Sequence, residues 1–219
     1  MRRDFVTVLR WTDVAIRYAG RPVRSVQGGV ARTVQAREGE EINLNEGVNM
    51  NAKPRMPAPK LEVSTVNGAT WRLSDSKPAN FTMIVVYRGR HCPLCKTYLA
   101  ELESKLGEFK NRGVDVIALS MDDALKAAES KADWGLQTLT VGYGMTEASA
   151  REWNLFISKA VKEGEPALFS EPGMFLIKAD GTLFTASVAN TPWARPPIDQ
   201  MIKAIDFFND RKPPARGEA

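Results

Sequence analysis

Hydrophobic positions first follow a regular pattern after Met56. Alternating stretches at residues 61–65 and 70–73 flank Asn67-Gly68, a dipeptide typical of a two-residue hairpin turn. Residues 81–87 then form an almost continuous apolar run, which is typical of a strand buried on both faces. The pattern therefore predicts an N-terminal β-hairpin followed by a central core strand.

Helical and extended periods alternate through the middle of the chain. Asp122 and Asp123 are residues that favour a helix start, and Thr146 is a second candidate cap. The predicted elements are a helix over 93–110, a strand over 114–120, a helix over 124–134, a strand over 136–141 and a short helix over 148–153.

The last part of the chain predicts a hairpin and a closing helix. Residues 174–177 and 183–188 flank Asp180-Gly181, and apolar residues recur on one side of a helix from Ile198 to Phe208. The polar tail beyond Asn209 is expected to fray.

Residues 155–171 show no clear period, and we interpret them as an insertion that carries a helical turn. Strands that alternate with helices, then a hairpin and a final helix, predict an α/β fold. We expect a central mixed β-sheet flanked by helices on both faces.

Composition narrows the function classes. The chain has 219 residues, 43% of them hydrophobic, which is enough for one substantial core. Its net charge of +4 is spread over mixed Lys, Arg, Asp and Glu, without the basic stripe that nucleic-acid binding requires. No run approaches the ~20 apolar residues that span a bilayer. We therefore expect no nucleic-acid partner and no membrane insertion.

The first 49 residues differ from the rest, because they contain arginine but no lysine and show no sustained period. We interpret residues 1–49 as a poorly ordered N-terminal extension and residues 50–219 as the folded domain. Residues 46–50 can also be encoded by a purine-rich, ribosome-binding-like sequence that ends in ATG. A second hypothesis is therefore that translation starts at Met50 and that the extension is an over-extended gene start.

Both cysteines of the chain, Cys92 and Cys95, lie two residues apart where the predicted core strand meets the predicted helix. A helix start offers unpaired backbone N–H groups and a partial positive charge, and both stabilise a thiolate. Such a setting lowers a thiol pKa from ~8.5 to roughly 3.5–7.5. The spacing favours a redox-active dithiol. Two cysteines are too few for a disulfide framework, so we expect a reducing, cytoplasmic compartment.

Other interpretations of the dithiol are weaker. A zinc site needs about four ligands, and this chain has no third cysteine and only one histidine, His91. A structural disulfide would close too short a loop to constrain the unfolded chain much. The alternative from another class is a non-catalytic module that uses the thiols for metal delivery or as a redox-gated interaction switch.

From about Pro57 onward the chain resembles the thioredoxin superfamily, and within it the peroxiredoxin-like branch of the alkyl hydroperoxide reductase/thiol-specific antioxidant family. The resemblance rests on Tyr-Arg-Gly-Arg-His-Cys-Pro-Leu-Cys at 87–95, Ser-Glu-Pro-Gly-Met-Phe-Leu-Ile at 170–177, Asp180-Gly181, Pro-Trp-Ala-Arg-Pro at 192–196 and Pro-Ala-Arg-Gly-Glu at 214–218. It implies a thioredoxin-like fold and thiol chemistry.

The dithiol loop departs from the peroxiredoxin pattern P-x-x-x-T-x-x-C. Aligned from Tyr87, that pattern places threonine on Cys92 and the attacking cysteine on Cys95, whereas the thioredoxin pattern makes Cys92 the attacking thiol. The helix start favours Cys92, which we expect to be the more exposed sulfur. The activating arginine of peroxiredoxins before the 174–177 strand is missing.

Four further residues are candidates for supporting roles. Arg88 and His91 flank the dithiol and can tune a thiolate or move a proton. Pro172 resembles the proline that faces the dithiol in thioredoxins, and we expect a cis peptide there. Arg195 precedes the closing helix and is expected to point towards the site.

Together these features predict a thiol-based oxidoreductase that reduces peroxides or disulfides. The neighbouring thiol would resolve the product as a Cys92–Cys95 disulfide. A thioredoxin- or glutathione-type reductant would regenerate the dithiol, with no bound cofactor or metal. A homodimer is compatible with this prediction.

Overall fold

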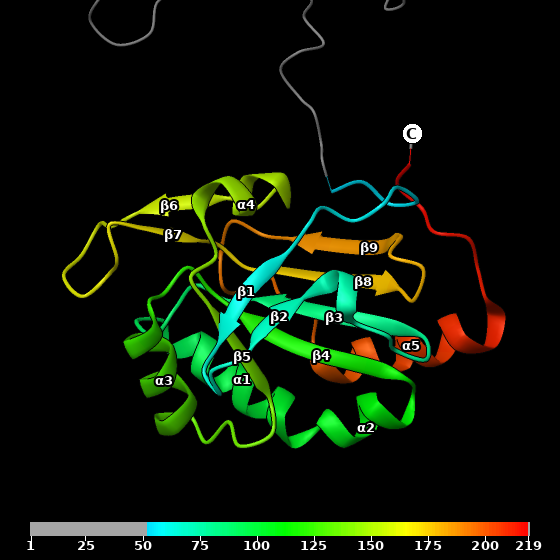
Figure 1. The fold of residues 1–219 in the computed structure, drawn as a ribbon, viewed down its shortest axis with the longest axis horizontal. Helices are drawn as coiled ribbons and strands as arrows, with labels where there is room; N and C mark the ends of the chain where they lie inside the picture. Colours follow the sequence, from blue (N-terminus) through cyan, green and yellow to red (C-terminus); the bar gives the residue numbers. More distant parts are fainter. Residues whose placement is uncertain (1–51, 219) are drawn as a thin grey trace, which may run out of the picture. The chain divides into compact units, whose positions relative to one another are not determined.

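The structure, a computed structural model, describes residues 52–218; the expected extension at 1–49 lies outside the described residues. A mixed sheet runs through this part (Figure 1). Its seven strands lie in the order β2 (Thr70–Arg72), β1 (Glu62–Thr65), β5 (Thr140–Tyr143), β4 (Val114–Leu119), β3 (Phe81–Val86), β8 (Gly173–Lys178) and β9 (Leu183–Val188).

The centre of the sheet is β3, whose six residues are all buried. It pairs in parallel with β4 and antiparallel with β8, so that Phe81 lies between Val114 and Lys178. This confirms both the predicted core strand and the mixed character of the sheet.

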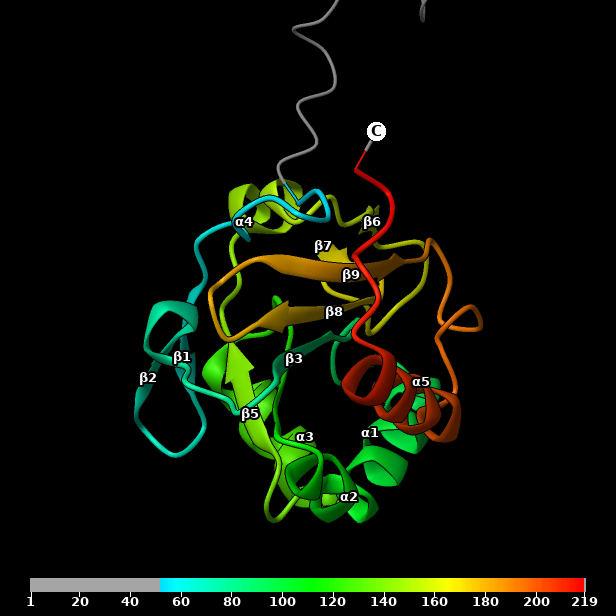
Figure 2. The same ribbon diagram turned by 90° about the vertical axis from the view of Figure 1, so that its right-hand side faces the viewer.

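Helices cover both faces of the sheet, but unequally, as Figures 1 and 2 show. The helices are α1 (Pro93–Ser104), α2 (Leu106–Asn111), α3 (Ala124–Asp133), α4 (Glu147–Glu152) and α5 (Ile198–Arg211), with a 3-10 turn at Leu73–Asp75. Met83 and Val85 join the apolar cluster that contains residues of α1, α2, α3 and α5. Ile84 and Val86 face the opposite cluster, to which α4 contributes. No helix between residues 52 and 218 is long and apolar enough to cross a membrane.

The two predicted hairpins are confirmed. Glu62 pairs with Arg72 across a turn at Gly68, which has the positive φ of 84° that such a turn requires. The second hairpin joins β8 to β9, where Met174 pairs with Ser187.

The prediction of a strand over 136–141 is wrong by several residues, since β5 begins only at Thr140. Leu136 and Leu139 are buried in the loop that precedes it. The Glu103 carboxylate accepts the N–H groups of Thr138 and Leu139, both at 2.8 Å. A side chain therefore replaces the strand partner that these backbone groups would otherwise need.

The predicted helix over 93–110 is interrupted at Lys105, which has φ −112° and ψ 6° and separates α1 from α2. The expectation of a frayed tail is also wrong. Helix α5 continues to Arg211, and beyond it Ala215 is buried in the core while Glu218 forms an ion pair with Arg55 at 2.7 Å.

Residues 155–171 fold as a small two-stranded sheet rather than around a helical turn. Strand β6 (Ile157–Lys159) pairs antiparallel with β7 (Leu168–Ser170), and Ile157 lies opposite Ser170. Both strands lie next to α4 in Figure 1. The pairing places Phe169 in the interior, where it contacts the dithiol loop.

Candidate active site

The dithiol lies where β3 leads into α1, as predicted. Cys92 is the N-cap of α1, and Pro93 supplies the preset φ of its first residue. Gly89 shapes the loop before it, with φ 131°. A Cβ at Gly89 would lie 2.7 Å from the Asp122 carboxylate, so this close approach requires glycine.

Both sulfurs are buried. Cys92 is 1% exposed and Cys95 is 0% exposed, so the expectation of an exposed Cys92 is wrong. The N-cap geometry turns the Cys92 side chain back over the first turn of the helix, and the packing of the surrounding core cluster buries it there. Its Sγ accepts the Cys95 N–H at 3.3 Å, and both side chains are free thiols.

The two thiols have opposite pKa shifts. A hydrogen bond from the Cys95 side chain lowers the pKa of Cys92 to about 6; the Cys95 N–H, Arg195 and Arg88 act in the same direction, while burial opposes them. Burial, followed by the hydrogen bond to Cys92, raises the pKa of Cys95. Near neutral pH this arrangement favours a Cys92 thiolate beside a protonated Cys95.

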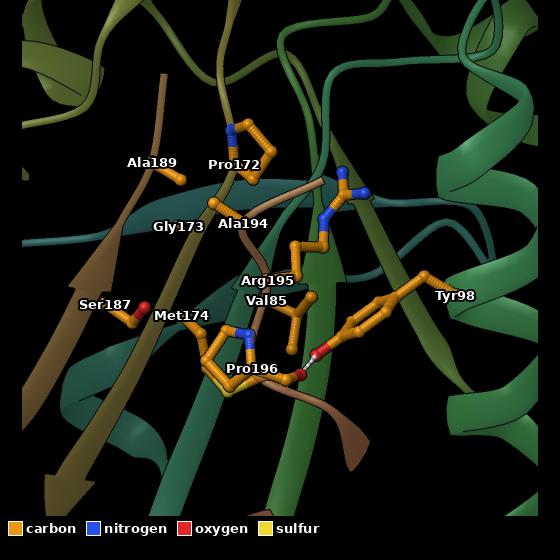
Figure 3. Close-up of a pocket in the computed structure, with 10 residues that line it drawn as sticks. All are labelled: Val85, Tyr98, Pro172, Gly173, Met174, Ser187, Ala189, Ala194, Arg195 and Pro196. Carbon is orange, nitrogen blue, oxygen red and sulfur yellow. Dashed lines mark hydrogen bonds between the residues drawn. The ribbon is translucent and has the colours of Figure 1, made fainter. Parts of the chain in front are cut away.

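Arg195 reaches the site as expected, from the loop before α5. Its Nη2 lies 2.9 Å from Cys95 Sγ, and its guanidinium lies 5.3 Å from the centre of the Tyr98 ring. Figure 3 shows Tyr98 donating a hydrogen bond to the Pro196 carbonyl, at 2.7 Å. Tyr98 therefore positions both the guanidinium and the loop that carries it.

Arg88 lies on another side of the dithiol loop. Its Nε is 3.2 Å from the Glu171 carboxylate, and its guanidinium lies 4.7 Å from the centre of the Phe169 ring. Glu171 also accepts the Ser158 hydroxyl at 2.6 Å. The contacts in this cluster hold β6 and β7 against the dithiol loop, and they place the Arg88 guanidinium near Cys92.

His91 contacts the same cluster, with its ring 4.6 Å from that of Phe169. Burial, and then the charge of Arg88, lowers its pKa to about 4. Neither ring nitrogen has a hydrogen-bond partner within residues 52–218. His91 is therefore a neutral imidazole at physiological pH.

Pro172 lies in the wall of a small cavity beside Arg195 (Figure 3). The expected cis peptide is wrong, because every peptide bond in the described part of the chain is trans. The Pro172 carbonyl accepts the Ala189 N–H at 3.0 Å, which extends the pairing between β8 and β9. With a trans peptide bond, the extended backbone between β7 and β8 places the Pro172 carbonyl where it accepts this hydrogen bond.

Two functional candidates, Asp122 and Glu171, were not identified from the sequence. Asp122 was assigned with Asp123 to a helix start, but only Asp123 caps α3. Asp122 instead accepts the Arg90 N–H at 2.8 Å, and burial raises its pKa. The available signal was a carboxylate soon after the end of a strand, since Asp122 lies three residues beyond β4 and Glu171 directly follows β7.

The residues at the site do not form an evident metal centre. Between residues 52 and 218, no three His, Cys, Asp or Glu side chains converge as metal ligands.

Comparisons with known proteins relate part of this sequence to peroxiredoxins. The 1-Cys peroxiredoxin B proteins of Oryza sativa subsp. indica and subsp. japonica are each 36% identical to this chain over 76 residues. The match covers 35% of this chain and about a third (32%) of each rice protein.

Solved structures show the same fold at low identity. A cysteine-to-serine mutant of peroxiredoxin 6 from Arenicola marina matches with a TM-score of 0.62 and 17% identity, over 73% of this chain and 74% of that one. The reduced 2-Cys peroxiredoxin of Plasmodium vivax matches with a TM-score of 0.60 and 17% identity, over 73% and 83%. Residues 54–185 match the model of the AhpC/TSA family, and the chain belongs to that family.

Proposed function

We propose that the protein is a thiol peroxidase in which Cys92 attacks and Cys95 resolves. The observation that carries this proposal is the Cys95 N–H directed at Cys92 Sγ, 3.3 Å away, at the first turn of α1. A backbone donor at a helix start stabilises a thiolate there without reorganisation. Membership of the AhpC/TSA family supports reduction of peroxide by a thiol, whereas the order of the two cysteines rests on the geometry.

The reaction has two steps. The Cys92 thiolate attacks one peroxide oxygen, the O–O bond breaks, and the alcohol or water leaves with a proton, so that Cys92 becomes a sulfenic acid. The Cys95 sulfur then attacks Cys92 Sγ, and its proton leaves with the hydroxyl group as water. The product is a Cys92–Cys95 disulfide within one chain.

Trapping the intermediate tests this order. Dimedone should label sulfenic acid in the Cys95→Ser protein after one equivalent of hydrogen peroxide. Intact-mass measurement of the wild-type protein should instead show the loss of two hydrogens in the monomer. Labelling only of Cys92→Ser would reverse the two roles, and absence of oxidation in all three proteins would support the non-catalytic alternative.

Disulfide reduction is a second candidate activity, because the thiolate attacks a disulfide sulfur by the same geometry. We further propose a cytoplasmic, reducing location, since the dithiol must be regenerated in each cycle. We also propose a homodimer, which sedimentation of the purified protein tests; Phe156, Val161 and Trp193 are large apolar side chains that are exposed in the single chain.

A further inference from the structure

A cavity of about 470 Å³ opens beside the dithiol loop, within the ~300–1,000 Å³ typical of small-molecule sites. It lies between that loop, the start of α3 and the turn that joins β6 to β7. Its lining consists of Arg90, His91, Asp122, Lys126, Glu129, Gly164 and Pro166.

Two lining residues carry buried polar atoms without partners. Asp122 is 4% exposed; its Oδ2 accepts the Arg90 N–H, while its Oδ1 has no partner among the described residues. The His91 ring nitrogens are unpartnered in the same sense. Buried polar groups are costly unless they are hydrogen-bonded, so this wall favours a ligand that donates hydrogen bonds.

The charges at the cavity have both signs. Arg90 is engaged by Glu129 at 2.8 Å and Asp133 at 2.7 Å, so it is not free to hold an anion. Lys126 has only a loose pair with exposed Asp123, at 3.7 Å. The cavity thus offers an available cation at Lys126 and a hydrogen-bond acceptor at Asp122.

We propose that this cavity binds the reductant of the Cys92–Cys95 disulfide, a low-molecular-mass thiol of the glutathione type that carries both a carboxylate and an ammonium group. The inference rests on the proposed function. Lys126 binds the carboxylate, Asp122 accepts from the ammonium or amide N–H, and neutral His91 does not repel the ammonium.

The burial of Cys92 selects a small thiol over a protein. Cys92 is 1% exposed, which disfavours approach by a cysteine on a folded partner. A small thiol bound in the cavity lies beside His91, the residue before Cys92, although neither cysteine is among the lining residues. The ligand thiolate attacks Cys92 Sγ, the disulfide opens, and the Cys95 sulfur leaves and takes a proton. A second thiolate attacks the ligand sulfur, releasing Cys92 thiolate and the oxidised dimer of the ligand.

Binding is tested first without redox chemistry. S-Methylglutathione, which has no free thiol, should bind the reduced full-length protein saturably with one site by calorimetry. Lys126→Glu and Asp122→Asn should each weaken binding by about tenfold, as expected for loss of a charge-assisted contact. Lys60→Glu, an equal charge change at an exposed residue outside the cavity, should leave it unchanged. Absence of saturable binding, or equal weakening in Lys60→Glu, overturns the proposal.

Kinetics provide the second arm. Reduction of the oxidised protein by glutathione should slow about tenfold in Lys126→Glu, while reduction by dithiothreitol, which is uncharged, should not change. If Lys126→Glu leaves the rate with glutathione unchanged and thioredoxin reduces the protein faster, the reductant is a protein. That result overturns the proposal that the cavity binds the reductant. Failure of peroxide to form the disulfide would instead sink the proposed function, and S-methylglutathione binding would still be measured independently.

Discussion

The Arg195 guanidinium contacts Cys95 Sγ at 2.9 Å, although the two residues lie 100 positions apart in the chain. Cys95 is fully buried, and burial alone would disfavour its thiolate. In the proposed cycle, the cation would compensate for burial at the moment when Cys95 leaves the disulfide with a negative charge. In that cycle, Arg195 would therefore serve reduction of the disulfide more than the first attack.

Replacing Arg195 with methionine should slow the opening of the Cys92–Cys95 disulfide by dithiothreitol. A hydrogen bond to a charged group contributes roughly 1.5–3 kcal/mol, which corresponds to about 10–150-fold in rate. Stopped-flow fluorescence measures the rate, with Arg211→Met, an exposed arginine in the last turn of α5, as control. Equal rates for wild-type and Arg195→Met would contradict this role.

The reaction with hydrogen peroxide should accelerate with rising pH, with a midpoint near the Cys92 pKa of about 6, and then level off. The thiolate is the nucleophile, so the rate follows its fraction. Single-turnover rates between pH 4.5 and 8.5 provide the profile. His91→Asn should keep the midpoint; a midpoint near that of a free thiol would show that Cys92 is not stabilised.

His91 should make the fold less stable in acid. Its pKa is about 4 when folded, against ~6.5 in an unfolded chain, so the unfolded state binds its proton first. The contribution of neutral His91 to the free energy of unfolding is fully present above pH ~6.5 and is lost as the pH falls towards 4. NMR can follow the ring directly because it is the only histidine. In His91→Phe, the urea concentration at the unfolding midpoint should fall less as the pH is lowered. An unchanged pH dependence would count against the lowered pKa of His91.

Gly89→Ala should lower the free energy of unfolding by at least about 2 kcal/mol, because its φ is 131° and a Cβ would lie 2.7 Å from Asp122. The matched control is Gly107→Ala in α2, where a Cβ meets nothing within 4 Å. That change should stabilise the protein by about 0.5–1 kcal/mol. Urea unfolding of both variants checks the difference, and equal free energies of unfolding for the two would refute it.

A chain that begins at Met50 should fold and keep dithiol reactivity. It retains the bonds of Ala52 to Asn154 at 3.0 Å and of Arg55 to Leu183 at 2.8 Å. A chain that begins at Pro59 loses both and should melt at a lower temperature. Thermal unfolding of both shortened chains and of the full chain tests the proposed domain boundary. A much lower melting temperature for the chain that begins at Met50 would show that residues before it pack in the core.

The spacing of apolar residues, together with the turn and cap residues, predicted those parts of the fold that depend on short stretches of sequence. The hairpin turn at Gly68, the capping of α3 by Asp123 and of α4 by Thr146, and the buried strand β3 all follow from short stretches of sequence. The strand β5 was misplaced because Leu136 and Leu139 are core residues whose backbone is bound by a distant carboxylate, Glu103.

The site was predicted only where its residues are neighbours in the chain. Cys92 and Cys95 were identified by their spacing, whereas the pairing of Arg88 with Glu171 depends on how β7 folds over the dithiol loop. The burial of Cys92 was missed for the same reason. A helix cap predicts a hydrogen bond to its sulfur but says nothing about what packs above it.

Both sulfurs belong to the apolar cluster that α1, α3 and α5 share, so a disulfide here rearranges the protein's own interior. A thermodynamic cycle then joins two measurements: the difference in unfolding free energy between oxidised and reduced protein equals the change in disulfide free energy that folding imposes. For this two-electron couple, 1.4 kcal/mol corresponds to roughly 30 mV. Substitutions of core residues such as Leu99 would thus shift the midpoint potential without altering any atom that exchanges electrons.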